Sequence, residues 1–106
     1  MAGTYNFPSI IKGDTFRKRT VTIVSDTNPL DLTGAVILMQ LKSNYRSDLV
    51  HTFETTIVDA AAGIVSIDNW DINVEPYDYL YDFKITQNNG ITLTYMSGKF
   101  PIKPSI

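Results

Sequence analysis

The feature that most constrains the fold is an alternating pattern near the C-terminus. Over residues 79–86, aromatic and aliphatic side chains alternate with polar ones, as in a strand with one buried face. An Asn89-Gly90 pair follows, and the alternation resumes over residues 91–96. Asn-Gly is the strongest short-range signal of a β-hairpin, because its tight turn needs positive φ angles. These residues therefore predict a strand, a turn and a second strand.

The composition of the whole chain also favours strands. Thr, Ile and Val number 12, 12 and 7 among the 106 residues, against only five Ala, seven Leu and two Glu. β-Branched side chains favour strands over helices, because their restricted rotamers suit a pleated sheet. No long segment carries a helical apolar stripe. We therefore expect one all-β domain over residues 1–106.

Turn residues divide the chain into seven or eight short strands, the pattern of an antiparallel β-sandwich. The expected strands lie near residues 7–11, 16–24, 35–42, 49–58, 64–68, 79–86, 91–96 and 99–103. Residues 35–42 are apolar on one face, and the other face carries Val36 and Leu38 before Gln40 and Lys42, which predicts a central strand covered on much of both sides. Residues 69–76 suit a strand or a crossing loop, and residues 43–48 a loop. A small barrel is an open alternative, because periodicity does not distinguish it from two packed sheets.

Two predictions concern the end of the chain. Ser97-Gly98 interrupts the alternation, which indicates a bulge or a bend. Pro101 and Pro104 cannot donate backbone hydrogen bonds, so the last strand is expected at a sheet edge.

Composition excludes several classes of function. The absence of cysteine and the single histidine exclude disulfides, thiolate sites and multi-histidine metal sites within one chain. A net charge of −2 disfavours nucleic acid as a partner. Residues 1–4 lack a basic signal-peptide start, and the apolar runs are too short to span a membrane. We expect no cofactor, no metal, no membrane association and folding in a cytoplasm.

Enzymatic chemistry has one candidate residue. His51 has the residue type of a general base, but it shares a strand face with Leu49 and Phe53, which favours a structural histidine. A Gly-x-Ser-x-Gly nucleophile elbow is missing from the sequence. We therefore expect no catalytic residues and no enzyme.

Two further clusters suggest binding. Asp68-Asn69-Trp70-Asp71 offers oxygen atoms for calcium, although turn chemistry is the simpler interpretation. Trp70 suits either a sugar-stacking platform or the core. Arg17-Lys18-Arg19 suggests contact with a phosphate or an acidic partner, or else an exposed edge strand protected by its charges. The candidate interaction surface therefore comprises Trp70, Asp71, Arg17 and Arg19.

Three segments together carry a family resemblance. They are Lys12-Gly13-Asp14-Thr15-Phe16, then Pro29-Leu30-Asp31-Leu32-Thr33-Gly34-Ala35, then Tyr79-Leu80-Tyr81-Asp82-Phe83-Lys84-Ile85 with Ser97-Gly98-Lys99-Phe100-Pro101-Ile102 after a Gly turn. In this order they resemble small bacteriophage tail and baseplate domains, including the N-terminal domain of upper-baseplate proteins. Those domains often carry Gly where this chain has Asp78, before the first of these tyrosines.

The physical reasons for these motifs are structural. Asp31 and Thr33 can cap a tight turn, and Gly34 permits positive φ. Tyr79 and Tyr81 are expected in the core, one of them as a tyrosine corner whose hydroxyl bonds the backbone upstream. Asp82 is expected to face away from the core and to bond a neighbouring loop.

The resemblance implies an immunoglobulin-like domain of the virion. It would act in a phage tail or baseplate by packing against copies of itself or against other virion proteins. Two alternatives stay open at this point. One is a carbohydrate- or receptor-binding module built around Trp70, and the other is a capsid decoration protein.

Overall fold

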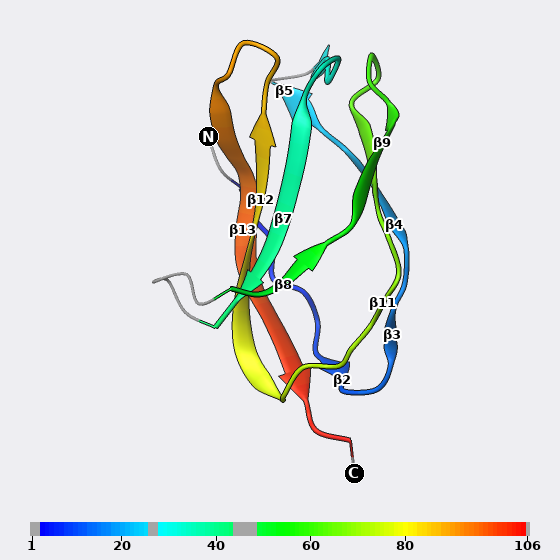
Figure 1. The fold of residues 1–106 in the computed structure, drawn as a ribbon, viewed down its shortest axis with the longest axis vertical. Helices are drawn as coiled ribbons and strands as arrows, with labels where there is room; N and C mark the ends of the chain where they lie inside the picture. Colours follow the sequence, from blue (N-terminus) through cyan, green and yellow to red (C-terminus); the bar gives the residue numbers. More distant parts are fainter. Residues whose placement is uncertain (1–2, 26–27, 44–48, 106) are drawn as a thin grey trace.

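The structure is a computed structural model that describes residues 3–25, 28–43 and 49–105. The described residues form strands and no helix, and the strands gather into several sheets (Figure 1). They therefore include no helix that could cross a membrane. The all-β prediction is confirmed. The described strands number 13 rather than seven or eight, because bends divide the expected segments.

The large sheet has the order β1-β13-β12-β7-β8, and β2 also pairs with β13. Its strands are β1 (Gly3–Thr4), β2 (Ile10–Ile11), β7 (Val36–Lys42), β8 (Leu49–Phe53), β12 (Tyr77–Thr86) and β13 (Thr92–Lys103). β12 and β13 form the predicted hairpin. The Gly90 amide donates to the Gln87 carbonyl over 2.8 Å, and Gly90 has a φ of 87°. The Asn-Gly signal was therefore correct.

The small sheet faces the large one and has the order β4-β10-β9. Its strands are β4 (Arg19–Thr22), β9 (Thr55–Asp59) and β10 (Ile64–Ile67). Two ribbons complete the fold: β3 (Thr15–Phe16) with β11 (Trp70–Asp71), and β5 (Val24–Ser25) with β6 (Asn28–Pro29).

The expectation of a purely antiparallel sheet is wrong. β1 and β2 run parallel to β13, so the large sheet is mixed. The N-terminal segment covers the outer edge of β13, where the Tyr5 amide donates to Ser97 and the Phe7 amide to Lys99. The prediction of an edge strand at 99–103 is therefore also wrong. Pro101 lies between the stretches paired with β1 and β2, so its missing N–H interrupts neither pairing.

The bulge lies earlier than predicted. Phe83 pairs with Met96 but Lys84 pairs with Thr94, so Tyr95 is the extra residue. Gly98 continues the strand and has a different function. A Cβ at this position would overlap the Tyr5 carbonyl and would lie 2.8 Å from Asn6 Oδ1. Glycine is therefore required for the N-terminal segment to approach β13.

Two long expected strands are divided between sheets. Over 49–58 the chain leaves the large sheet after Phe53 and joins the small sheet at Thr55. Over 16–24, residues 17–18 separate β3 from β4. The segment 69–76 is mainly a crossing segment with the two-residue strand β11. Of the loop expected at 43–48, residues 44–48 lie outside the described part of the chain.

The core fills the space between the large and small sheets. Phe83, Phe100 and Met39 come from the large sheet, and Val65 and Ile67 from the small one, all within 1% of complete burial. β7 lies between β12 and β8, as predicted for a central strand, but the prediction that much of both its faces is covered is wrong.

On β7, Leu41 is fully buried while Val36 is 64% and Leu38 39% exposed. The described residues therefore leave the face of the large sheet that is turned away from the core, its outer face, uncovered.

Candidate functional site

The Asp31–Gly34 turn is built as the sequence predicts. Asp31 Oδ1 accepts hydrogen bonds from the Thr33 amide at 3.0 Å and from the Thr33 hydroxyl at 2.7 Å. These bonds lower the pKa of Asp31 below its ordinary value. Gly34 has a φ of 75°, and the Ala35 amide donates to the Leu32 carbonyl. The turn sets the direction in which the chain enters β7, which begins at Val36, so the role of the turn is structural.

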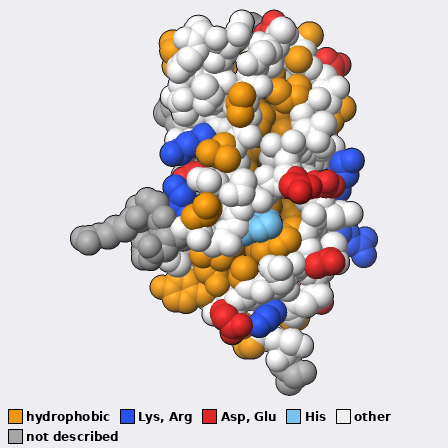
Figure 2. Space-filling view, in the orientation of Figure 1, with side chains coloured by type: hydrophobic (Ala, Val, Ile, Leu, Met, Phe, Trp, Pro, Cys, Tyr) orange, Lys and Arg blue, Asp and Glu red, His pale blue; other side chains and the backbone are white. Residues whose placement is uncertain are grey.

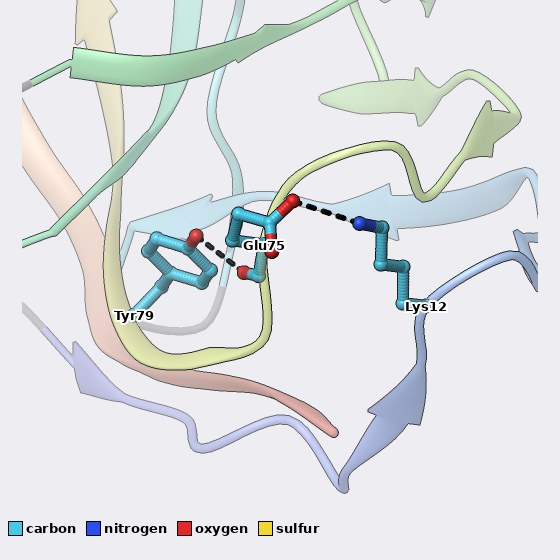
Figure 3. A network of polar contacts seen from close by, with 3 residues as sticks. All are labelled: Lys12, Glu75 and Tyr79. Carbon is cyan, nitrogen blue, oxygen red and sulfur yellow. Dashed lines mark hydrogen bonds and ion pairs between the residues drawn. The ribbon is translucent and has the colours of Figure 1, made fainter. Parts of the chain in front are cut away.

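The predicted tyrosine corner is Tyr79. Its hydroxyl donates to the Glu75 carbonyl, four residues upstream, over 2.5 Å, and the Glu75 carboxylate forms an ion pair with Lys12 at 2.9 Å (Figure 3). Burial, and secondarily the Glu75 charge, raises the pKa of Tyr79. The corner fixes the crossing segment against the start of β12.

Tyr81 makes a second bond of the same kind. Its hydroxyl donates to the Tyr5 carbonyl over 2.6 Å, and burial raises its pKa to about 12. Both tyrosines are nearly buried, as predicted. They hold the N-terminal and crossing segments in place and offer no accessible acid or base.

The predicted Trp70 platform is not exposed. Trp70 is 9% exposed and the His51 ring stacks on it, with centroids 3.8 Å apart and planes 8° apart. The His51 ring therefore covers the face of the indole on which a sugar ring would stack. Burial lowers the pKa of His51, an effect that the Glu54 charge opposes. His51 has the structural surroundings that its strand face predicted.

The oxygen atoms near Trp70 accept hydrogen bonds from within the chain. Asp71 accepts from the Thr15 hydroxyl at 2.6 Å, Asn69 from the Lys18 amide at 2.6 Å, and Asp68 from the Asn69 amide at 3.0 Å. Among the described residues, His and acidic side chains form no cluster suited to a metal ion. The turn interpretation accounts for Asp68, whereas Asp71 and Asn69 tie the crossing segment to β3 and to the bend that follows it.

The basic cluster is divided by its contacts. Arg19 lies over the rings of Phe16 and Phe7, with its guanidinium 4.5 and 5.3 Å from their centroids. Arg17 and Lys18 lie in the bend between β3 and β4. β4 is an edge strand of the small sheet, as predicted. Of the four residues of the candidate interaction surface, Trp70 is therefore buried, whereas Asp71, Arg17 and Arg19 are exposed.

The outer face of the large sheet contains a depression that sequence reasoning missed. It measures about 640 Å³. We call it the Asp82 depression, and Asp82, Lys42, Lys84, Lys99, Thr4, Asn6, Leu80, Tyr81, Thr94, Ser97 and Gly98 line it. Figure 2 shows basic and acidic side chains close together over β12 and β13, with hydrophobic side chains beside them over β7.

At the centre of the depression lies an ion pair between neighbouring strands. Asp82 on β12 is opposite Gln40 on β7, which places it within reach of Lys42. Asp82 Oδ2 lies 3.1 Å from Lys42 Nζ, and the side chains are 19% and 17% exposed. Asp82 faces away from the core, as predicted, but its partner is on a strand rather than on a loop. Asp82 Oδ1 is buried and has no described hydrogen-bond partner.

The alternation carried part of this signal. It placed Asp82 and Lys84 on one strand face and Lys42 on the polar face of its own strand. Their convergence depends on the pairing register of β12 with β7 and of β12 with β13. Sequence alone does not supply that register.

Comparison with known proteins adds no family assignment. No model of a known protein family matches the chain, and no curated protein matches it at a significant level.

Proposed function

We propose that this protein is a structural or assembly component of a bacteriophage particle, in the tail or baseplate, and that it acts through protein–protein contacts. The order of the segments at residues 12–16, 29–35 and 79–85 supports this proposal by resemblance. The turn at Asp31 and the corner at Tyr79 adopt the local structures expected of those segments. We also infer that the two facing sheets form an immunoglobulin-like sandwich, in which a tyrosine corner is a recurring element.

The observation that carries the proposal is the uncovered outer face of the large sheet. Val36 and Leu38 are exposed along β7, and the Asp82 depression lies beside them. Exposed apolar side chains next to charged ones are typical of surfaces that bind other proteins. A second copy of the chain is the partner we propose for this face, within a particle assembled in the host cytoplasm.

Light scattering coupled to size-exclusion chromatography tests the proposal. We expect mass to rise with concentration, and negative-stain microscopy to show a regular assembly at the highest concentration. A chain that stays monomeric throughout would contradict self-association.

The genes beside the coding gene give an independent test of the virion assignment. We expect them to encode other tail, portal or lysis proteins. A neighbourhood of metabolic genes would contradict a virion role even if the protein self-associates.

A further inference from the structure

The small sheet ends in an edge strand with free backbone groups. β4 pairs with β10 on one side, and no described strand pairs with it on the other. The Ile23 amide, just after β4, donates to the carbonyl of Gly63, just before β10, over 2.8 Å. Because the direction of these groups alternates along an antiparallel strand, Thr20 and Thr22 point their N–H and C=O groups away from β10. β4 therefore offers two donors and two acceptors on its free side.

The pairing on the opposite side of β10 gives the same alternation. The Asp68 amide donates to the Glu54 carbonyl over 2.8 Å, so Ser66, two residues earlier, also directs its backbone groups toward β9. Its neighbour Val65 therefore directs them toward β4, where it is opposite Val21. Both pairings agree that the free backbone groups of β4 belong to the residues on either side of Val21.

The other edges of the two sheets are interrupted or short, whereas β4 is regular. Val58 is an extra residue in β9, because its neighbours Ile57 and Asp59 pair with consecutive residues of β10. Val50 is an extra residue in β8 in the same way, and β1 and β2 have two residues each. Bulges and short strands discourage edge-to-edge pairing. The register of β4 has no such shift, so β4 is the edge among the described strands that is best suited to accept another strand.

The basic residues near β4 restrict the direction of an added strand. The Arg19 guanidinium lies against the rings of Phe16 and Phe7, and Arg17 and Lys18 are exposed in the bend before the strand. These charges therefore lie at one end of β4, and residues 20–22 carry none. A parallel second copy in the same register would place like charges opposite one another, which is unfavourable.

An antiparallel second copy separates these charges. With Val21 opposite Val21 of the second copy, Thr20 lies opposite Thr22 of that copy, and all the free backbone groups of both threonines are paired. Val21 packs toward the core and the threonines are exposed, so Thr–Thr pairs form on the solvent side. Arg19 is then four positions, about 13 Å along the strand, from Arg19 of the second copy. This separation exceeds the screening length of about 8 Å at physiological ionic strength.

We propose that β4 pairs with β4 of a second copy, antiparallel and about a two-fold axis at Val21. Three strands from each copy then form one continuous six-stranded sheet. The contact is isologous, so by itself it joins two copies and stops. It uses an edge of the small sheet and therefore goes beyond the self-association proposed for the outer face of the large sheet. A protein with both contacts extends into a larger assembly.

Single cysteines test the register, because the chain has no cysteine of its own. A contact this small is transient, and a disulfide traps it. Opposed, hydrogen-bonded residues have Cα atoms about 5.5 Å apart, within disulfide range. Thr20→Cys mixed with Thr22→Cys should therefore form the mixed disulfide at least about tenfold faster than either variant forms its own. Labelling one variant with ¹⁵N identifies mixed dimers by mass spectrometry.

The matched control is Thr56→Cys, which places an exposed cysteine on the interrupted edge strand β9. Mixed with Thr22→Cys, it should form disulfides only at the background rate. Circular dichroism and thermal melting establish that each variant is folded.

A second readout uses the backbone N–H itself. In ¹⁵N NMR spectra of the wild type, the Thr20 amide resonance should shift as the protein is concentrated to the millimolar range. Thr22→Pro removes an outward N–H and leaves the hydrogen bonds to β10 in place, so the shift should disappear. Thr22→Val is the matched control, because it keeps the N–H and the β-branched side chain, and the shift should persist.

Three outcomes would overturn the inference. They are mixed disulfides no faster than the Thr56→Cys control, homodisulfides faster than mixed ones, and a wild-type Thr20 resonance that does not depend on concentration. The proposed function is tested separately by light scattering of Thr22→Pro. If that variant still gains mass with concentration, the outer face associates whatever the result at β4. If it stays monomeric while the wild type gains mass, association through the outer face is contradicted and pairing through β4 is supported.

Discussion

Single residues in this protein act mainly by tying segments of irregular chain to the sheets. The Tyr79 and Tyr81 hydroxyls donate to backbone carbonyls of the crossing and N-terminal segments. The His51 ring covers Trp70. The two hydroxyls satisfy backbone carbonyls that no strand pairing satisfies, and the imidazole shields one face of the indole from solvent. Two predictions follow from these residues.

The Tyr79 hydroxyl should have a measurable effect on stability. Tyr79→Phe removes the bond to the Glu75 carbonyl and should lower the free energy of unfolding by about 0.5–1.5 kcal/mol in urea titration. Tyr77→Phe is the matched control, because Tyr77 is 55% exposed and its hydroxyl has no described partner. Equal losses in the two variants would argue against the corner.

The burial of His51 should make stability depend on pH. The pKa of His51 in the folded chain is below the ordinary 6.5. Between these two pKa values, His51 is therefore protonated in the unfolded chain and neutral in the folded chain. The contribution of His51 to the free energy of unfolding is constant above about pH 7.5. The free energy of unfolding then falls as the pH drops through 6.5 toward the pKa of His51 in the folded chain. Urea titrations from about pH 7.5 to about pH 5 should show a smaller loss in His51→Gln. An NMR titration that places the His51 pKa above 6.5 would contradict this.

At the scale of elements, β13 organises the molecule. It pairs along its length with β12 on one side and with β1 and β2 on the other. Pro101 and Gly98 predicted an edge and a bulge by local rules. Instead, Pro101 falls between the two parallel pairings of β13, and Gly98 permits the N-terminal segment to lie against this strand. Local propensity was overridden here by a contact more than 90 residues away in sequence, between Asn6 and Lys99.

Gly98→Ala should test this close approach. The new Cβ would overlap the Tyr5 carbonyl, a backbone atom that cannot turn away as a flexible side chain can. We expect the free energy of unfolding to fall by about 1–3 kcal/mol, with increased hydrogen exchange in residues 3–7. Gly90→Ala serves as a comparison, because its positive φ is strained but a Cβ there meets nothing within 4 Å. A loss at Gly98 without increased exchange would contradict the explanation.

At the scale of the whole molecule, the core lies between two layers, and the described residues leave Val36 and Leu38 exposed on the outer face of the large sheet. β7 shows the asymmetry between the two faces directly. Leu41 is fully buried and Leu38, on the same strand, is 39% exposed. We therefore expect the exposed apolar residues on the outer face to contribute little to folding, and the proposed function would use them for association.

A pair of substitutions on β7 tests this division. Leu41→Ala should lower the free energy of unfolding by about 2–5 kcal/mol, because it leaves a cavity in the core. Leu38→Ala should lower it by about 1 kcal/mol or less in dilute solution, because that side chain already contacts solvent. Thermal or urea unfolding measures both. Equal losses would show that the outer face is covered in the folded chain.

The sequence by itself determined the strand content, the hairpin at Asn89-Gly90 and the turn at Asp31, and it predicted a tyrosine corner without deciding which tyrosine forms it. All of these depend on residues close together in the chain, where backbone geometry and alternation suffice. The tertiary structure alone decided which strands pair, and therefore the mixed sheet, the free outer face of β7 and the burial of Trp70. The meeting of Asp82 with Lys42, Lys84 and Lys99 belongs to this second group, because strand register is set by long-range packing that no local pattern encodes.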